Sequence, residues 1–402
     1  MTVFQPMPKS RQPKPTGPQI ERAVLVAVEA KKRGEQLWGL QDTLDELDYL
    51  TRSAGAEVVA TVSQRADRTT PTYLGKGKLQ ELQDVLAEER PDVVICDDEL
   101  TPTQQRNLEN ALQIKVLDRT ALILDVFGRH ARTREGQMQV ELAQHQYLLP
   151  RLIGQWSHLE RLGGGIGTRG PGETQLETDR RLVRRRIQKI ESELDSVRKR
   201  RSQYLERRRR SATPMATLVG YTNAGKSTLF NALCDAGVPA EDQLFNTLDP
   251  VTRRLRLNDG SELLLSDTVG FIQKLSPTVV AAFRATLAEL DEADLLLHVI
   301  DITHPKAPEQ VEVVEQTLNE LDLGGKPRLL VINKMDLLTD DPADVESFDQ
   351  IDLSVLAATD SPAVTGRVFV SAVRGWNLPA LLDAVLHQVQ TPVPSVSAAA
   401  TV

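Results

Sequence analysis

The stretch MATLVGYTNAGKS, residues 215–227, places Gly220, four residues and then Gly225-Lys226-Ser227 directly after a short apolar run. This pattern predicts a strand, a phosphate-binding loop and a helix over 228–234. The glycines let successive backbone N–H groups point at phosphate oxygens, and the helix dipole favours the same anion. Lys226 is expected to reach the β- and γ-phosphates, and the Ser227 hydroxyl is expected to bind Mg²⁺.

A second motif, Asp267-Thr-Val-Gly270, follows the apolar stretch ELLLS and lies 40 residues after Ser227. An aspartate at the end of a strand can hold Mg²⁺ through water, and the Gly270 N–H can reach the γ-phosphate. Alone the motif is weak evidence. Its place after the phosphate loop and two predicted strands makes it specific.

A third motif, Asn333-Lys-Met-Asp336, follows the apolar stretch RLLVI, where a base-recognition loop lies in such a sheet. The Asp336 carboxylate can accept hydrogen bonds from the ring N–H and the amino group of guanine, and adenine lacks that arrangement. Lys334 can lay its methylene stem along the base, while Asn333 ties this loop to the phosphate loop. The pair Ser371-Ala372 is expected near the guanine O6.

Between the first two motifs lies Phe245-Asn-Thr-Leu-Asp249. Thr247 can bring its hydroxyl to Mg²⁺ and its N–H to the γ-phosphate, which would order this loop only with a triphosphate bound. Lys226, Thr247 and Gly270 are therefore the predicted catalytic residues, and Ser227, Thr247 and Asp267 the predicted metal ligands. The predicted nucleotide contacts are Gly220, Tyr221, Thr222, Asn223, Ala224, Gly225, Lys226, Ser227, Phe245, Asn246, Thr247, Leu248, Asp249, Asp267, Thr268, Val269, Gly270, Asn333, Lys334, Met335, Asp336, Ser371, Ala372 and Val373.

The periodicity of the chain predicts an α/β protein with three parts. Residues 20–130 alternate short apolar strands with amphipathic helices, which indicates a small parallel α/β domain. Residues 212–390 combine near-continuous apolar strands, such as 295–300 and 328–332, with intervening helices, and this predicts a doubly wound G domain. The sequence YLGKGK at 73–78 can either contact phosphate or simply open the next helix.

Residues 131–211 have a helical pattern that is interrupted by a glycine-rich stretch at 161–172, which predicts an antiparallel helical hairpin with a flexible tip. From Arg180 to Arg210, 14 Lys or Arg against 4 Asp or Glu give a net charge of +10, although the whole chain carries −8. A basic helix beside a glycine-rich tip favours contact with an RNA backbone rather than DNA. Because the hairpin covers its own apolar seam, we expect a monomer.

Composition sets the remaining expectations. Residues 1–19 are rich in proline and lack an apolar core, so they predict a disordered leader, and 391–402 a disordered tail. Two cysteines, far apart and without metal-site spacing, favour a reduced, cytoplasmic compartment. No apolar run is long enough to span a bilayer, which leaves only peripheral membrane contact open.

Together these motifs resemble the HflX family of ribosome-associated GTPases, within the translation-factor-related class. The resemblance covers nearly the whole chain and is strongest in GGGIGTRGPGETQLETDRR at 163–181. It implies GTP hydrolysis, binding to the large ribosomal subunit and its RNA, ribosome splitting, rescue or recycling, and a hairpin tip directed toward the peptidyl-transferase centre. It also implies that Asn223 stands where related GTPases coordinate K⁺.

Phe271 occupies the position after DTVG, where many GTPases have a glutamine that orients the attacking water. A phenyl ring cannot do this, so hydrolysis is expected to be slow until a partner, another residue or an ion completes the site. One alternative is a ribosome-assembly GTPase, and another is an ATP-dependent RNA remodeller that uses residues 73–78. No complete ATP motif precedes residue 215. A scaffold with a silent G domain is disfavoured because the phosphate-loop and base-recognition residues are all present.

Overall fold

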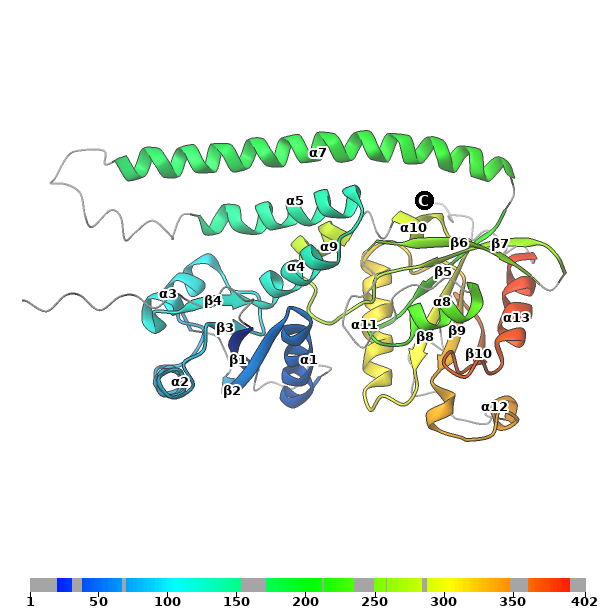
Figure 1. Ribbon diagram of the computed structural model, residues 1–402, viewed down its shortest axis with the longest axis horizontal. Coiled ribbons are helices and arrows are strands. Elements are labelled where there is room, and N and C mark those ends of the chain that lie inside the picture. Colours follow the sequence, from blue (N-terminus) through cyan, green and yellow to red (C-terminus); the bar gives the residue numbers. More distant parts are fainter. Residues whose placement is uncertain are drawn as a thin grey trace, which may run out of the picture.

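The fold comes from a computed structural model, shown in Figure 1. It describes residues 20–30, 38–66, 70–152, 171–211, 213–234, 249–257, 259–283, 288–347 and 361–390. The predicted leader and tail lie outside these ranges, and so do residues 161–170 of the predicted hairpin tip. An N-terminal α/β domain and a C-terminal G domain lie next to each other, and one long helix spans both. The predicted fold class is therefore confirmed.

The N-terminal domain is a parallel four-stranded sheet in the order β2-β1-β3-β4. The central strands β1 and β3 are apolar because helices cover both faces of the sheet and bury their side chains, whereas the edge strand β2 is only partly buried. The strands are β1 (Glu21–Ala30), β2 (Ala56–Ala66), β3 (Val93–Cys96) and β4 (Lys115–Asp118). The helices are α1 (Leu40–Ser53), α2 (Lys76–Glu89), α3 (Pro102–Leu112) and α4 (Arg119–His130).

The sequence at 73–78 opens α2, with Gly75 as the N-cap residue. Tyr73 has φ = +62° and is 2% exposed, and its hydroxyl donates a hydrogen bond to Asp98 at 2.7 Å. Lys78 forms an ion pair with Glu81 at 2.8 Å. The structure thus supports the turn-and-helix interpretation of this segment.

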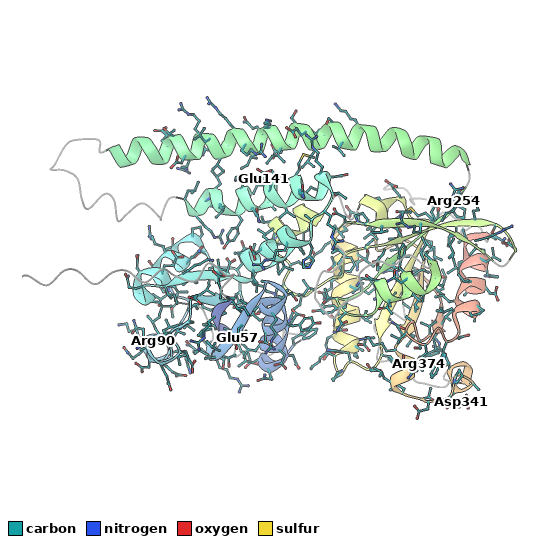
Figure 2. The ribbon with its side chains drawn as sticks, viewed as in Figure 1. Glu57, Arg90, Glu141, Arg254, Asp341 and Arg374 are labelled. Atoms are coloured by element: carbon teal, nitrogen blue, oxygen red, sulfur yellow. The ribbon has the colours of Figure 1, made fainter. Side chains whose placement is uncertain are left out.

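The hairpin pairs α5 (Arg134–Arg151) with α7 (Pro171–Ser211). Their shared apolar contact is small: Met138 from α5 packs with Ile190 and Leu194 from α7. Arg186 reaches across to Glu141 with two hydrogen bonds of 2.7 Å, and Figure 2 shows Glu141 between the two helices. Pro150 lies inside α5, one residue before the last residue of the helix, Arg151.

The G domain is a six-stranded sheet in the order β10-β9-β8-β5-β7-β6, parallel except for β6 against β7. Helices α8 and α13 pack on one face and α11 on the other. The strands are β5 (Met215–Val219), β6 (Val251–Arg256), β7 (Glu262–Asp267), β8 (Leu295–Asp301), β9 (Arg328–Asn333) and β10 (Val364–Phe369). The helices are α8 (Lys226–Cys234), α9 (Pro277–Phe283), α10 (Ala288–Glu292), α11 (Ala307–Glu320), η1 (Met335–Leu337), α12 (Asp344–Ser347) and α13 (Leu378–Gln390).

One hydrophobic core crosses the boundary between the two domains. It joins Leu47 and Phe127 of the N-terminal domain to Val269, Phe271 and Ile272 of the G domain. Helix α9 packs on α4 and α5, so the segment after DTVG lies against both the N-terminal domain and the hairpin. Within the described residues, no helix is long and apolar enough to cross a membrane.

Candidate functional site

The phosphate loop lies between β5 and α8, at the carboxyl ends of the parallel strands. Gly225 has φ = +93°, and a Cβ atom at this position would collide with the Asn333 side chain. Only glycine combines that backbone conformation with such a close approach. The loop can therefore wrap tightly around an anion while touching the base-recognition loop.

Lys226, the first residue of α8, is buried and turned inward. Its Nζ donates hydrogen bonds to the backbone oxygens of Gly220 at 3.1 Å and Tyr221 at 2.7 Å. Burial lowers the pKa of Lys226 to about 8, although Asp267 acts in the opposite direction. The ammonium group is thus held beside the loop by two backbone carbonyl oxygens.

Two side-chain groups whose oxygen atoms can bind a metal ion, from Ser227 and Asp267, lie together on the other side of the loop. The Ser227 hydroxyl donates to the Asp267 carboxylate at 2.7 Å, and Asp267, at the end of β7, is fully buried. Hard oxygen donors beside a phosphate site suit Mg²⁺, which typically takes one or two protein oxygens and completes its shell with phosphate and water. The chemistry of these residues therefore fits the predicted cation.

The DTVG segment is joined to the phosphate loop by its backbone. Thr222 N–H donates to the Phe271 oxygen at 2.8 Å, and Phe271 N–H donates to the Gly220 oxygen at 3.0 Å. A Cβ atom on Gly270 would lie 2.8 Å from the Thr222 Cα and 2.9 Å from the Lys226 Nζ. A side chain at position 270 would therefore displace the lysine that is expected to hold the phosphates.

The base-recognition loop is held in place by hydrogen bonds to its neighbours. Asn333 donates through Nδ2 to the Ala224 oxygen at 2.9 Å and accepts from the Ala372 N–H at 3.0 Å, so it ties this loop to the phosphate loop as expected. The Ser371 hydroxyl donates to Asp336 at 2.6 Å. Lys334, with φ = +65°, pairs with Asp301 at 2.7 Å. Motifs far apart in the sequence thus converge on one edge of the sheet.

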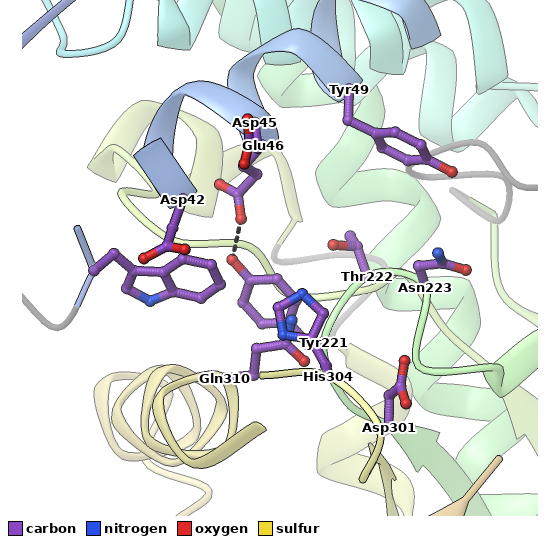
Figure 3. Close-up of a pocket in the computed structure, with 11 residues that line it drawn as sticks. Asp42, Asp45, Glu46, Tyr49, Tyr221, Thr222, Asn223, Asp301, His304 and Gln310 are labelled. Carbon is purple, nitrogen blue, oxygen red and sulfur yellow. Dashed lines mark hydrogen bonds between the residues drawn. The ribbon is translucent and has the colours of Figure 1, made fainter. Parts of the chain in front are cut away.

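A cavity of about 260 Å³ adjoins the phosphate loop, between α1 and the G domain (Figure 3). Its residues from the phosphate loop are Tyr221, Thr222 and Asn223, and Asp301 and His304 come from the end of β8 and the turn beyond it. Sequence reasoning missed its lining from the N-terminal domain. No local signal marks these residues, which are Trp38, Asp42, Asp45, Glu46 and Tyr49.

Residues 245–248 of the predicted switch segment, including Thr247, lie outside the described part of the chain. Asp249 is described, and its carboxylate has protein partners at the start of α5. It accepts hydrogen bonds from the N–H groups of Arg132 and Thr133, both at 2.6 Å, and from the Thr133 hydroxyl at 2.5 Å. The segment that follows Thr247 is therefore anchored to the base of the hairpin.

The chain is similar to known proteins over most of its length. Three family models match consecutive parts of the chain, described as GTP-binding GTPase N-terminal (41–128), GTP-binding GTPase middle region (130–209) and 50S ribosome-binding GTPase (215–334). GTPase HflX of Alkalihalophilus pseudofirmus is 48% identical over 361 residues, which are 90% of this chain and 84% of the relative. The chain belongs to the HflX family of GTPases. HflX of Escherichia coli strain K12 is 45% identical, over 88% of this chain and 80% of the relative.

This HflX-family chain is therefore a GTP-hydrolysing enzyme with a phosphate-loop G domain. Among solved structures, the GDP complex of the protein called SsGBP is 26% identical, with a TM-score of 0.49 and coverage of 92% of this chain and 98% of that chain. A GTP-binding protein of Sulfolobus solfataricus with GDP is 25% identical, with a TM-score of 0.45 and coverage of 92% and 99%.

Proposed function

We propose that the chain binds GTP and GDP at these loops and hydrolyses GTP there, using the nucleotide contacts predicted from its sequence. The supporting observation is that Lys226, Asp267 and Asn333 all converge on the phosphate loop. The ammonium group of Lys226 would hold the β- and γ-phosphates, and Gly270 would donate its N–H to the γ-phosphate. Thr247 would add a second N–H to the same phosphate.

Metal binding is part of this proposal. Ser227, Thr247 and Asp267 would hold Mg²⁺, which neutralises the charge that develops on the phosphate oxygens. Asn223, in the phosphate loop, would provide an oxygen ligand for K⁺. Turnover in potassium chloride is then expected to exceed turnover in sodium chloride.

Water activation is the step that the described residues leave to a partner. Phe271 has a phenyl ring, which can neither accept nor donate a proton, and this ring is packed in the core between the two domains. Hydrolysis by the free protein should therefore be slow, and association with a ribosome should accelerate it.

The partner that the hairpin fits best is the large ribosomal subunit through its RNA. Arg181, Arg184, Arg185 and Lys189 are exposed along α7, on the side away from the buried Ile190. A row of cations of this kind binds a phosphate backbone and releases counterions. The match to a family described as 50S ribosome-binding GTPase supports the same partner. Ribosome splitting, rescue or recycling is the proposed role.

This proposal predicts that RNA affinity depends on the exposed cations of α7. Replacing Arg181, Arg184 and Arg185 with glutamine should reduce the magnitude of the negative slope of log affinity against log salt by about 2, since each lost contact with single-stranded RNA contributes about 0.7. Binding of large subunits and the GTP turnover that they stimulate should fall together. Sedimentation of the full-length protein with purified large subunits over a salt series measures the slope.

Three cations on β6 provide the matched control, because they are exposed and belong to the G domain rather than to α7; Figure 2 labels Arg254 among them. Replacing Arg253, Arg254 and Arg256 with glutamine removes the same charge and should leave the slope unchanged. Equal losses in both variants would show non-specific attraction and contradict the assignment of α7. A preference for immature over mature subunits would instead favour ribosome assembly.

The buried lysine predicts a pH dependence of nucleotide binding. Burial lowers the pKa of Lys226 to about 8, and phosphates favour its charged form, so nucleotide binding should raise that pKa. Affinity for GDP with Mg²⁺ should thus be constant below about pH 7 and fall by up to about tenfold per pH unit above about pH 8. Calorimetry in two buffers with different ionisation enthalpies should detect proton uptake near pH 8. Lys226→Arg keeps its charge and should abolish that uptake; uptake that persists in this variant would contradict the assignment.

A further inference from the structure

Tyr221 of the phosphate loop turns its side chain away from the nucleotide side and into the N-terminal domain. Its ring is 4% exposed and stacks on Trp38, with the ring centroids 5.8 Å apart. Its hydroxyl donates to the Glu46 carboxylate of α1, as Figure 3 shows, and accepts from the Gln273 N–H at 3.1 Å. One phenol thus connects the phosphate loop, the segment after DTVG and the N-terminal domain.

The Glu46 carboxylate belongs to a larger buried group of charges. Arg119, the first residue of α4, is 1% exposed and donates to Glu46 and to Asp97, the latter at 2.8 Å. Lys274, from the segment after DTVG, donates to Asp97 and to Asp98, the latter at 2.7 Å. The G domain is therefore attached to this group of charges at two places, through Tyr221 and through Lys274.

Both attachments adjoin the DTVG segment, whose Gly270 is proposed to contact the γ-phosphate. Phe271 follows Gly270, is bonded by its backbone to Gly220 and Thr222, and is buried against the N-terminal domain. Gln273 and Lys274 come three and four residues after Gly270. A shift of Gly270 would therefore also shift the residues that follow it, and these residues contact the N-terminal domain.

We infer that Glu46, Arg119 and Asp97 are positioning residues for GTP hydrolysis. They act through Tyr221 and Lys274, and they couple the conformation of the N-terminal domain to that of the phosphate loop and the DTVG segment. Such coupling is reciprocal. If the conformation of the N-terminal domain changes nucleotide affinity by a given free energy, nucleotide binding shifts the conformational equilibrium of that domain by the same free energy. The part of this inference that concerns activation by large ribosomal subunits rests on the proposed function.

The first test does not need ribosomes. Hydrogen–deuterium exchange of the full-length protein is measured in α1 and α4, with Mg²⁺ and either GDP or a non-hydrolysable GTP analogue. The wild type should show a difference between the two nucleotides. Tyr221→Phe keeps the ring on Trp38 but removes the hydroxyl, and should reduce that difference about tenfold, since hydrogen bonds to charged groups carry this much coupling.

Tyr147→Phe is the matched control, because Tyr147 is buried in the same core but does not touch the phosphate loop. It should keep the wild-type difference. A graded change gives a second check, because Glu46 accepts from Arg119 and from the phenol on separate oxygens. Glu46→Gln retains one accepting oxygen and should keep part of the difference, whereas Glu46→Ala should lose it. A full wild-type difference in both Tyr221→Phe and Glu46→Ala would overturn the inference.

The second test uses GTP turnover with purified large subunits. The loss in Tyr221→Phe should appear mainly in kcat, by about tenfold, rather than in KM for GTP, since the phenol faces away from the nucleotide. Unchanged kcat in a stimulated system would count against the inference. If the wild type is not stimulated by large subunits while exchange still depends on Tyr221, the proposed partner is wrong and the coupling stands.

Discussion

Replacing Asp336 with asparagine is expected to change nucleotide preference from guanine to xanthine. The Asp336 carboxylate is proposed to accept two hydrogen bonds, from the ring N–H and the amino group of guanine. An asparagine amide would face that amino group with its own N–H, whereas xanthine offers a carbonyl oxygen there. A site built around hydrogen bonds rejects the mismatched base strongly, so affinity for GDP should fall about a hundredfold or more and affinity for XDP should rise.

Displacement of a fluorescent nucleotide by GDP, XDP and ADP measures this preference. Asp340→Asn is the matched control, because it makes the same change at an exposed position in the segment just after the motif. Ser371→Ala removes the hydroxyl that donates to Asp336 at 2.6 Å and should weaken GDP binding only modestly, by about tenfold at most. Undiminished GDP affinity in Asp336→Asn would exclude this residue from base recognition.

The G domain and its central motifs could be predicted from the sequence because their signals are local. Apolar runs such as 295–300 and 328–332 predict buried parallel strands, and both are found there. A motif that follows such a strand must lie at the carboxyl edge of the sheet, where all parallel strands end. The hydrogen bond from Asn333 to Ala224 is a consequence of that topology.

The attachments between the domains could not be predicted in this way. Glu46 lies on a helix with ordinary amphipathic spacing, and its partners Arg119 and Tyr221 are 73 and 175 residues away. The motif of Asp249 predicts a nucleotide contact, and it gives no sign that this carboxylate also accepts hydrogen bonds from residues 116 and 117 positions earlier. Local periodicity says whether a side chain faces inward, but not which distant element it meets. A strand-end aspartate such as Asp301 could have been noticed from its position alone.

Replacing Arg119 with methionine is expected to destabilise the N-terminal domain strongly, and with it the attachment of that domain to the G domain. Arg119 and Asp97 are each 1% exposed, and the change would leave Glu46 buried without Arg119 and Asp97 paired with Lys274 alone. Breaking a buried ion pair from one side typically costs about 3 to 5 kcal/mol. Chemical denaturation, followed by a separate probe in each domain since multidomain proteins often unfold in more than one step, measures the loss.

The pH dependence of that loss distinguishes a charge effect from a packing effect. Burial raises the pKa of Glu46, while Arg119 and then Tyr221 act against the rise. Without Arg119 the folded pKa of Glu46 should rise further above its unfolded value. The folded state then gains stability on protonation, so the penalty is complete above the folded pKa and shrinks as pH falls through it. Arg119→Met should therefore be less destabilising at about pH 5 than at about pH 7.5, and adding Glu46→Gln should recover part of the loss at the higher pH. The loss in free energy of unfolding could instead be the same at both pH values and be no smaller in the double variant. That result would mean that Arg119 stabilises the protein through the packing of its side chain rather than through its charge.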